Sequence, residues 1–228
     1  MSSSQLAEAN FDRMVSVTWQ GVPMRDALAR LANANRVGLF IDRRVDPTTL
    51  INFKAENKTV RQVFLDFADS AGLYCYFFGS VVYIGQDKMR DIFPLLISRH
   101  RKFVAQIDKN APANKMLPAA RAKLQRLVNI RLPMLSEPKN VLKNLAQQHQ
   151  FTWHNLDKVP HDVWAENILP PMPMGDFLIL MLVGFDLDYV CEFQDKDSSD
   201  KNSPVKNSSD KMILRIIDIS ENKPPIKL

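Results

Sequence analysis

The sequence repeats its own pattern at a fixed spacing of 114 residues, and this repeat constrains the fold more than any other feature. The stretch from Val22 to Ile84 holds two amphipathic helical segments, each followed by a short apolar run. Matching residues recur 114 positions later: Leu28 and Leu142, Leu31 and Leu145, Ala32 and Ala146, Val45 and Val159, Leu73 and Leu187. A spacing kept over this length predicts two divergent copies of one small α/β unit.

Each copy is expected to run as strand, helix, strand, strand, helix and hairpin, because alternating and helical apolar spacings follow in that order. The predicted strands are 15–19, 37–41, 50–55, 73–78, 81–84, 128–132, 151–153, 186–193 and 212–219. Helices are predicted at 24–35, from 60 until Gly72, and at 89–106, 119–127 and 175–184, with a further helix opening near Ser136. Thr59 and Ser136 are the expected N-caps, and Pro138 lies in a first helical turn.

The fold class predicted from this order is α+β, with two tandem small βαββαββ domains that place two helices between small sheets. A helical connector joins them. The expected organisation is a polar lead at 1–13, domain one at 14–86, a basic connector at 87–127, domain two at 128–219 with a flexible loop at 194–210, and a tail at 220–228. The segment Pro170–Met174 is expected to be a rigid lead into the last helix.

Composition excludes several classes of protein. The chain has 228 residues, 46% of them hydrophobic and 24% charged, with a net charge of +5, which is ordinary for a globular protein that is mildly basic. It has no run of about 20 apolar residues, so no membrane span is expected. The start, MSSSQLAEAN, lacks the basic and apolar regions of a secretory signal, so export would require a longer chain. Cys75 and Cys191 are expected to be buried free thiols.

The first copy resembles the secretin and TonB short N-terminal domain. The residues that carry the resemblance are "VPMRDALARLA", "VGLFID", "KTVRQVFLDFADSAGL" and "YCYFFGSVVYIG". With the strand that precedes them, the match covers Val15–Ile84. The second copy matches more weakly, with Asp186 where the pattern has glycine, and its segment from Val159 to Val190 also resembles uncharacterised planctomycete envelope proteins. The resemblance implies docking or signalling in the bacterial envelope or periplasm, without catalysis.

No motif for chemistry is present in the sequence. Seven glycines form no phosphate-binding loop, no Cys/His pair has zinc-ligand spacing, and no nucleophile elbow occurs. We therefore expect no catalytic residues, no metal, no cofactor and no small-molecule substrate. The expected partner is a protein of the envelope or a second copy of this chain.

The loop Pro160–Trp164 is the first candidate for partner binding. It combines a titratable ring at His161, a carboxylate at Asp162 and an amphipathic aromatic at Trp164. The alternative is that Trp164 fills the core of the second copy while His161 and Asp162 cap a helical turn.

Two further sets of residues could bind partners. Tyr74 and Tyr76 share a strand face with Phe78 and could stack on a ligand, or the face could instead be covered by a helix or the other domain. The connector supplies three cations in a short run, Arg99, Arg101 and Lys102. These would bind nucleic acid or another anionic polymer, which is the alternative function, or else form a solvated face.

Overall fold

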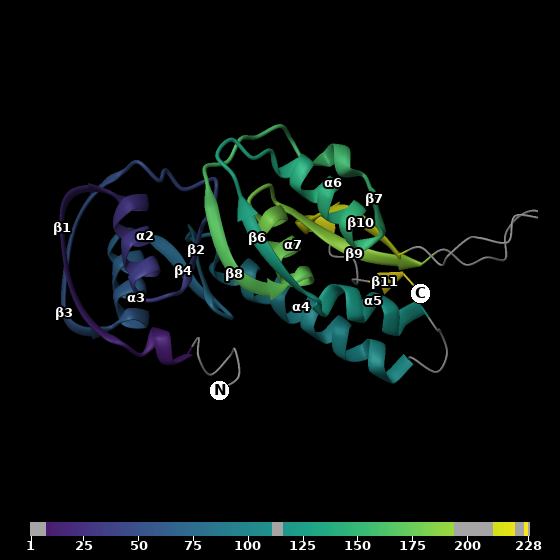
Figure 1. Cartoon of the computed structure of the whole chain (residues 1–228), viewed down its shortest axis with the longest axis horizontal. Helices are drawn as coiled ribbons and strands as arrows, with labels where there is room; N and C mark the ends of the chain where they lie inside the picture. Colours follow the sequence, from purple (N-terminus) through teal and green to yellow (C-terminus); the bar gives the residue numbers. More distant parts are fainter. Residues whose placement is uncertain (1–7, 111–115, 194–211, 222–225, 228) are drawn as a thin grey trace, which may run out of the picture. The chain divides into compact units, whose positions relative to one another are not determined.

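The computed structural model describes residues 8–110, 116–193, 212–221 and 226–227 (Figure 1). The predicted loop at 194–210 lies outside these residues, as do the first seven residues of the lead and part of the tail. The architecture is α+β, built from helices and four small sheets, so the predicted fold class is confirmed. Among the described residues, no helix is both long and apolar enough to cross a membrane.

The first copy consists of two small sheets and two helices. One sheet pairs β1 (Met14–Pro23) with β3 (Leu50–Thr59) antiparallel. The other has the order β2-β5-β4, with β2 (Gly38–Ile41) parallel and β4 (Leu73–Phe78) antiparallel to β5 (Val81–Gln86). The helices are α2 (Met24–Ala34) and α3 (Val60–Ser70), and one apolar core takes side chains from both helices and both sheets.

The second copy has the same topology. Strands β6 (Leu127–Leu132) and β8 (Asn167–Pro173) form the two-stranded sheet, and the helices are α6 (Pro138–His149) and α7 (Met174–Val183). In the larger sheet β7 (Phe151–His154) lies parallel and β9 (Leu187–Phe193) antiparallel to β10 (Met212–Asp218). A short extra strand, β11 (Ile226–Lys227), pairs in parallel with β9 at the edge of that sheet. Two 3₁₀ turns, η1 (Leu156–Lys158) and η2 (Ile219–Glu221), complete it.

The spacing of the repeat is kept in the structure. Helices α2 and α6 begin at Met24 and Pro138, α3 and α7 at Val60 and Met174, and β4 and β9 at Leu73 and Leu187, each pair 114 residues apart. The backbone keeps the same spacing at its unusual points. Among the described residues, six of the nine positive φ angles form pairs 114 residues apart: Gly21 and Leu135, Arg36 and Gln150, Gly72 and Asp186. The two copies therefore share three of their turns as well as the order of their elements.

The connector consists of α4 (Met89–Asn110) and α5 (Met116–Gln125). By contacts between residues, the chain divides into two compact units, one made of residues 1–93, 129–131 and 167–172, and the other of the remainder. The division falls inside α4, between Phe93 and Pro94. Proline lacks the backbone N–H that would bond the preceding turn, so α4 is one hydrogen bond short at this point.

Two local predictions require correction. Ser136 is not the N-cap of α6, because that position is held by Glu137 and the Ser136 hydroxyl donates to the carbonyl of Pro133 at 2.6 Å. The segment Pro170–Met174 is not only a lead into α7, since most of it belongs to strand β8. A two-stranded sheet leaves one side of each strand unpaired, which is where proline is tolerated. The Thr59 cap is confirmed, because its hydroxyl accepts the Gln62 N–H at 3.1 Å.

Candidate protein-docking surface

Two loops of the second copy are joined by a backbone bridge and carry exposed apolar side chains. Ser136 and Trp164 form an isolated antiparallel bridge, with the Trp164 N–H donating at 2.9 Å and the Ser136 N–H at 3.2 Å. Beside this bridge Met134 is 64% exposed, Leu135 70% and Val163 45%. We call residues 133–136 and 160–164 the bridged loops. The bridge restrains the two loops relative to each other, and their apolar side chains are exposed to water.

Leu135 is in the left-handed region, with φ of 64°. It is the third residue of a turn closed by the Ser136 N–H to Pro133 carbonyl bond at 3.2 Å, a position where positive φ favours glycine. The equivalent residue in the first copy is Gly21, with φ of 60° and, among the described residues, open space where a Cβ would stand. A non-glycine residue in this conformation costs roughly 1–2 kcal/mol. The second copy therefore carries backbone strain together with an exposed leucine where the first copy carries neither.

Trp164 is fixed by contacts on two sides. Its indole N–H donates to Asp162 Oδ2 at 2.8 Å, and its ring stacks on Phe185 with centroids 6.1 Å apart and an interplanar angle of 10°. The Trp164 side chain is half-buried. No helical turn occurs at 160–164, and His161 and Asp162 therefore cap nothing there. His161 is exposed, and the carboxylate of Asp162 positions the indole instead.

The aromatic face of β4 is covered by the first turns of α4. Phe93 packs edge-on against Tyr76 with ring centroids 5.3 Å apart, and against Phe78 at 5.9 Å. Tyr74 is buried, and burial raises the pKa of its phenol to about 12. Of the two predicted tyrosines, only Tyr76 keeps a partly exposed ring, so this face is not an open platform for stacking bases.

The three cations of the connector lie in different environments. Arg99 forms an ion pair with Asp188 of β9, and burial lowers the pKa of its guanidinium. Arg101 and Lys102 are exposed. Burial raises the pKa of Asp176 to about 6, and the positive charge of Arg101 reduces this increase. Arg99 therefore does not belong to an exposed basic patch, because its charge is neutralised inside the second unit.

His100 completes this buried cluster. Its Nε2 lies 2.7 Å from the other carboxylate oxygen of Asp188, and its ring packs on Tyr189 with centroids 4.3 Å apart. Burial and the charge of Arg99 lower the pKa of His100 to about 3, so the imidazole is neutral. The cluster joins α4 to β9. Sequence patterns could not reveal it, because His100 and Asp188 are 88 residues apart.

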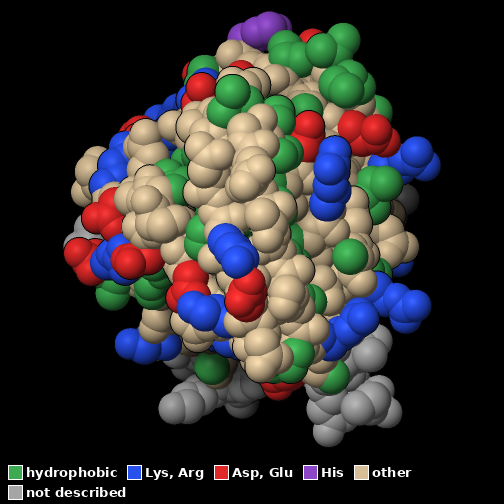
Figure 2. All heavy atoms as spheres, turned by 90° about the vertical axis from the view of Figure 1, so that its left-hand side faces the viewer, with side chains coloured by type: hydrophobic (Ala, Val, Ile, Leu, Met, Phe, Trp, Pro, Cys, Tyr) green, Lys and Arg blue, Asp and Glu red, His purple; other side chains and the backbone are tan. Residues whose placement is uncertain are grey.

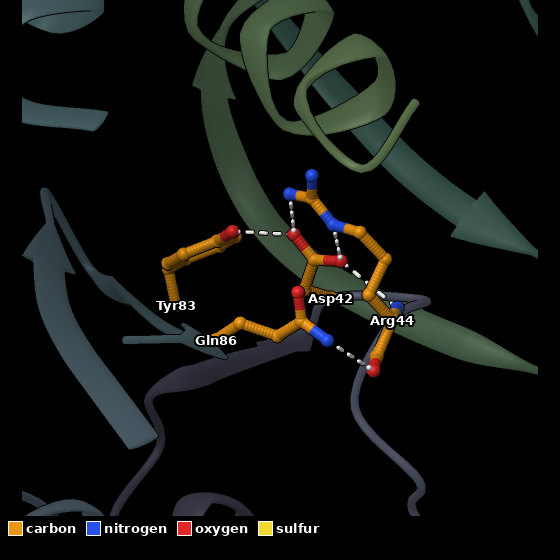
Figure 3. A network of polar contacts seen from close by, with 4 residues as sticks. All are labelled: Asp42, Arg44, Tyr83 and Gln86. Carbon is orange, nitrogen blue, oxygen red and sulfur yellow. Dashed lines mark hydrogen bonds and ion pairs between the residues drawn. The ribbon is translucent and has the colours of Figure 1, made fainter. Parts of the chain in front are cut away.

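A second buried carboxylate in the first copy is saturated by its neighbours (Figure 3). Arg44 binds both oxygens of Asp42 from Nε at 2.9 Å and from its terminal nitrogen at 2.7 Å, and the Tyr83 hydroxyl donates at 2.5 Å. Gln86 donates to the Arg44 carbonyl at 3.1 Å. Burial raises the pKa of Asp42, but the hydrogen bonds from Arg44 and Tyr83 outweigh it and the pKa lies below its ordinary value. These bonds fix the loop after β2 and occupy both oxygens of the carboxylate.

A shallow hollow of about 220 Å³ adjoins this network and is lined by Arg44, Gln86 and mainly apolar neighbours. The guanidinium of Arg44 already binds Asp42, and the amide of Gln86 already donates to the Arg44 carbonyl, so neither is set to fix a small ligand. Among the described residues, no three side chains of His, Cys, Asp or Glu gather as a metal would require.

Charge on the first copy is mixed. On the side that carries β1 and β3, Lys and Arg side chains alternate with Asp and Glu (Figure 2). Lys54 and Glu56 of β3, for example, form an ion pair at 2.6 Å. A face of this kind is solvated and gives no field of one sign that would attract a polyanion.

Sequence reasoning selected Trp164 and its neighbours but missed Met134 and Leu135. The signal was present, because Leu135 lies 114 residues after Gly21 and a leucine in place of glycine in a turn marks an unusual position.

Comparison with family models, with curated proteins and with solved structures finds no match to this chain. Its function is therefore inferred from its own geometry.

Proposed function

We propose that this chain is a non-enzymatic protein-docking module, and that the bridged loops of its second copy are the docking surface. The observation that carries the proposal is the exposure of Met134, Leu135 and Val163 around the Ser136–Trp164 bridge. Exposed apolar side chains on neighbouring loops with a restrained backbone are typical of surfaces that bind another protein.

The strain at Leu135 supports a functional origin for this surface. Glycine at the same position in the first copy indicates that the turn itself does not need leucine. Strained residues persist where function over-rides stability, and an exposed leucine gains little from burial in its own chain. Leucine at position 135 is explained if its side chain is buried by a partner.

Trp164 supplies an anchor next to these side chains. Its ring is oriented by Asp162 and Phe185, so a partner would meet an aromatic surface that loses little conformational entropy on binding. The resemblance of the first copy to the secretin and TonB short N-terminal domain supports a partner in the bacterial cell envelope, with the module on its periplasmic side.

The test is site-directed photo-cross-linking in cells that produce the full chain. The photoreactive residue p-benzoylphenylalanine replaces Val163 in one variant and Leu65 in a matched control. Leu65 is also an exposed apolar side chain, 38% accessible, but it lies on α3 of the first copy. We expect one defined protein adduct from position 163 and none from position 65.

A second substitution ties the adduct to the surface. Met134→Ser combined with Leu135→Ser removes the exposed apolar atoms without touching the core, so it should abolish the adduct from position 163. Equal adducts at both positions, or an adduct that survives the double substitution, would overturn the proposal.

A further inference from the structure

The outer edges of β4 and β9 are equivalent, and within the described residues only that of β9 is paired. Both strands form the hairpin of their copy, and their first residues, Leu73 and Leu187, are 114 residues apart. In the second copy β11 pairs in parallel with the edge of β9, with Ile226 opposite Cys191 and Lys227 opposite Glu192. In the first copy β4 is the last strand of its sheet within the part of the chain that the structure describes.

The edge of β4 lacks the usual protection against strand pairing. Proteins protect exposed edges with charges, prolines or bulges, because unpaired N–H and C=O groups accept any extended chain. The strand reads LYCYFF, which contains no charge and no proline. Its pairing with β5 runs without a register shift from Leu73 opposite Gln86 to Phe78 opposite Val81. Nothing in β4 itself therefore opposes the addition of a further strand.

We propose that the edge of β4 binds an extended peptide segment of a partner protein, which adds to the sheet in the parallel direction. The direction follows from β11, which shows that the equivalent edge accepts a parallel strand. In the second copy β11 pairs with Cys191 and Glu192 of β9. The residues 114 positions earlier in β4 are Phe77 and Phe78, so we expect two residues of the added peptide to lie opposite these phenylalanines.

The two faces of β4 define the chemistry of the guest. Leu73, Cys75 and Phe77 face the core of the first copy, while Tyr74, Tyr76 and Phe78 face α4. Side chains of an added strand extend both faces, so uncharged, apolar residues fit at successive positions. This surface lies in the first copy and is separate from the bridged loops, so each can fail without the other.

The test uses the full chain labelled with ¹⁵N and, as the probe, the synthetic peptide NKPPIVL. This is the sequence of residues 222–228 with valine in place of Lys227, so that both residues expected to pair with β4 are uncharged and apolar. The chain's own tail holds the edge of β9 at a high effective concentration, so an added peptide meets the edge of β4 as the open position. We expect saturable amide shifts across residues 73–78. The matched control peptide carries proline in place of isoleucine, removes the donor at the centre of the strand and should give no shifts.

Two results would overturn the proposal. One is the absence of shifts at residues 73–78 at millimolar peptide. The other is a set of shifts confined to residues 187–193, which would mean that the peptide only exchanges with the chain's own tail. Neither result bears on the cross-linking test at position 163, which reports on the second copy.

Discussion

Gly21 and Leu135 hold the same left-handed backbone conformation at equivalent positions of the two copies, with φ angles of 60° and 64°. The two turns share this backbone angle, while their side chains differ. Glycine adopts this region without steric cost, and leucine does not. Exchanging the two residues therefore measures how much leucine in this conformation lowers the free energy of unfolding.

Leu135→Gly should leave the free energy of unfolding unchanged or raise it by up to about 1 kcal/mol. Relief of the left-handed strain stabilises the folded chain, and the greater freedom of glycine in the unfolded chain offsets part of the gain. The reciprocal change, Gly21→Leu, should lower it by about 1–2 kcal/mol. Urea unfolding of both variants measures the difference, and a destabilised Leu135→Gly variant would show that Leu135 packs within its own chain.

Thr59→Ala should lower the free energy of unfolding by about 1 kcal/mol, because the Gln62 N–H at the start of α3 loses its acceptor. Ser136→Ala is the matched control, since both residues look like N-caps in the sequence but only Thr59 caps a helix. It removes one exposed hydroxyl bond to Pro133 and should cost clearly less. Thermal unfolding of the two variants compares them, and equal losses would contradict the assigned caps.

Asp188→Asn should destabilise the chain by about 1–3 kcal/mol, because it removes the charged acceptor of the half-buried Arg99 guanidinium. The control is Asp91→Asn, which changes a carboxylate in the first turn of the same helix that has no part in the cluster. A small loss at Asp188, measured by chemical unfolding, would mean that Arg99 turns toward water.

The stabilisation that neutral His100 contributes should fall as the pH drops from about 6.5 toward 3, and Asp176, whose pKa burial raises to about 6, offsets part of this fall. Burial and Arg99 lower the pKa of His100 to about 3 in the folded chain, whereas an unfolded histidine has a pKa near 6.5. Between these values the unfolded chain binds a proton that the folded chain does not. The stabilisation from neutral His100 is therefore complete above pH 6.5 and decreases as the pH falls toward 3. One proton corresponds to about 1.4 kcal/mol per pH unit.

His100→Gln removes the titrating group while keeping a donor toward Asp188, so it should make the pH dependence between 6.5 and 5 shallower. Asp176, whose pKa burial raises to about 6, titrates in the same interval, but it is present in both chains. The difference in slope between His100→Gln and the unchanged chain therefore isolates the contribution of histidine. His161→Gln is the control, because His161 is exposed. Unfolding free energies at several pH values measure the slope, and an unchanged slope in His100→Gln would contradict a neutral buried His100.

Both cysteine thiols should react slowly in the folded chain. Cys75 and Cys191 are free, and burial raises the pKa of each thiol to about 12. The thiolate is the reactive form, so almost none is present at pH 8. A colorimetric thiol reagent should label both residues rapidly in denaturant and neither rapidly without it. Rapid labelling of Cys75 in the folded chain would show that β4 opens easily.

Helices were the most predictable part of this fold. Apolar side chains at helical spacing, the Thr59 cap and Pro138 in a first turn act within a few residues of one another, so the sequence carries their signal directly. The hairpin formed by β4 and β5 was predicted for the same reason, since Gly79 supplies the positive φ of its turn. The repeat then extended these local signals to the second copy.

Strand extents and charge environments were less predictable, because they depend on residues far away in the sequence. Strand β8 forms through prolines because β6 pairs with it, and Arg99 is half-buried where it meets Asp188. The outer edge of β9 is paired only because the tail returns to it.

Local periodicity and the spacing of 114 residues were enough to predict the α+β class, the duplication and the approximate start of most helices. Contacts between distant segments, in contrast, set which charges are neutralised inside the chain, which apolar side chains remain in water and which strand edges are paired. These properties could not be predicted from the sequence alone, because the free energy of burying a side chain depends on every neighbour that it meets in the folded chain.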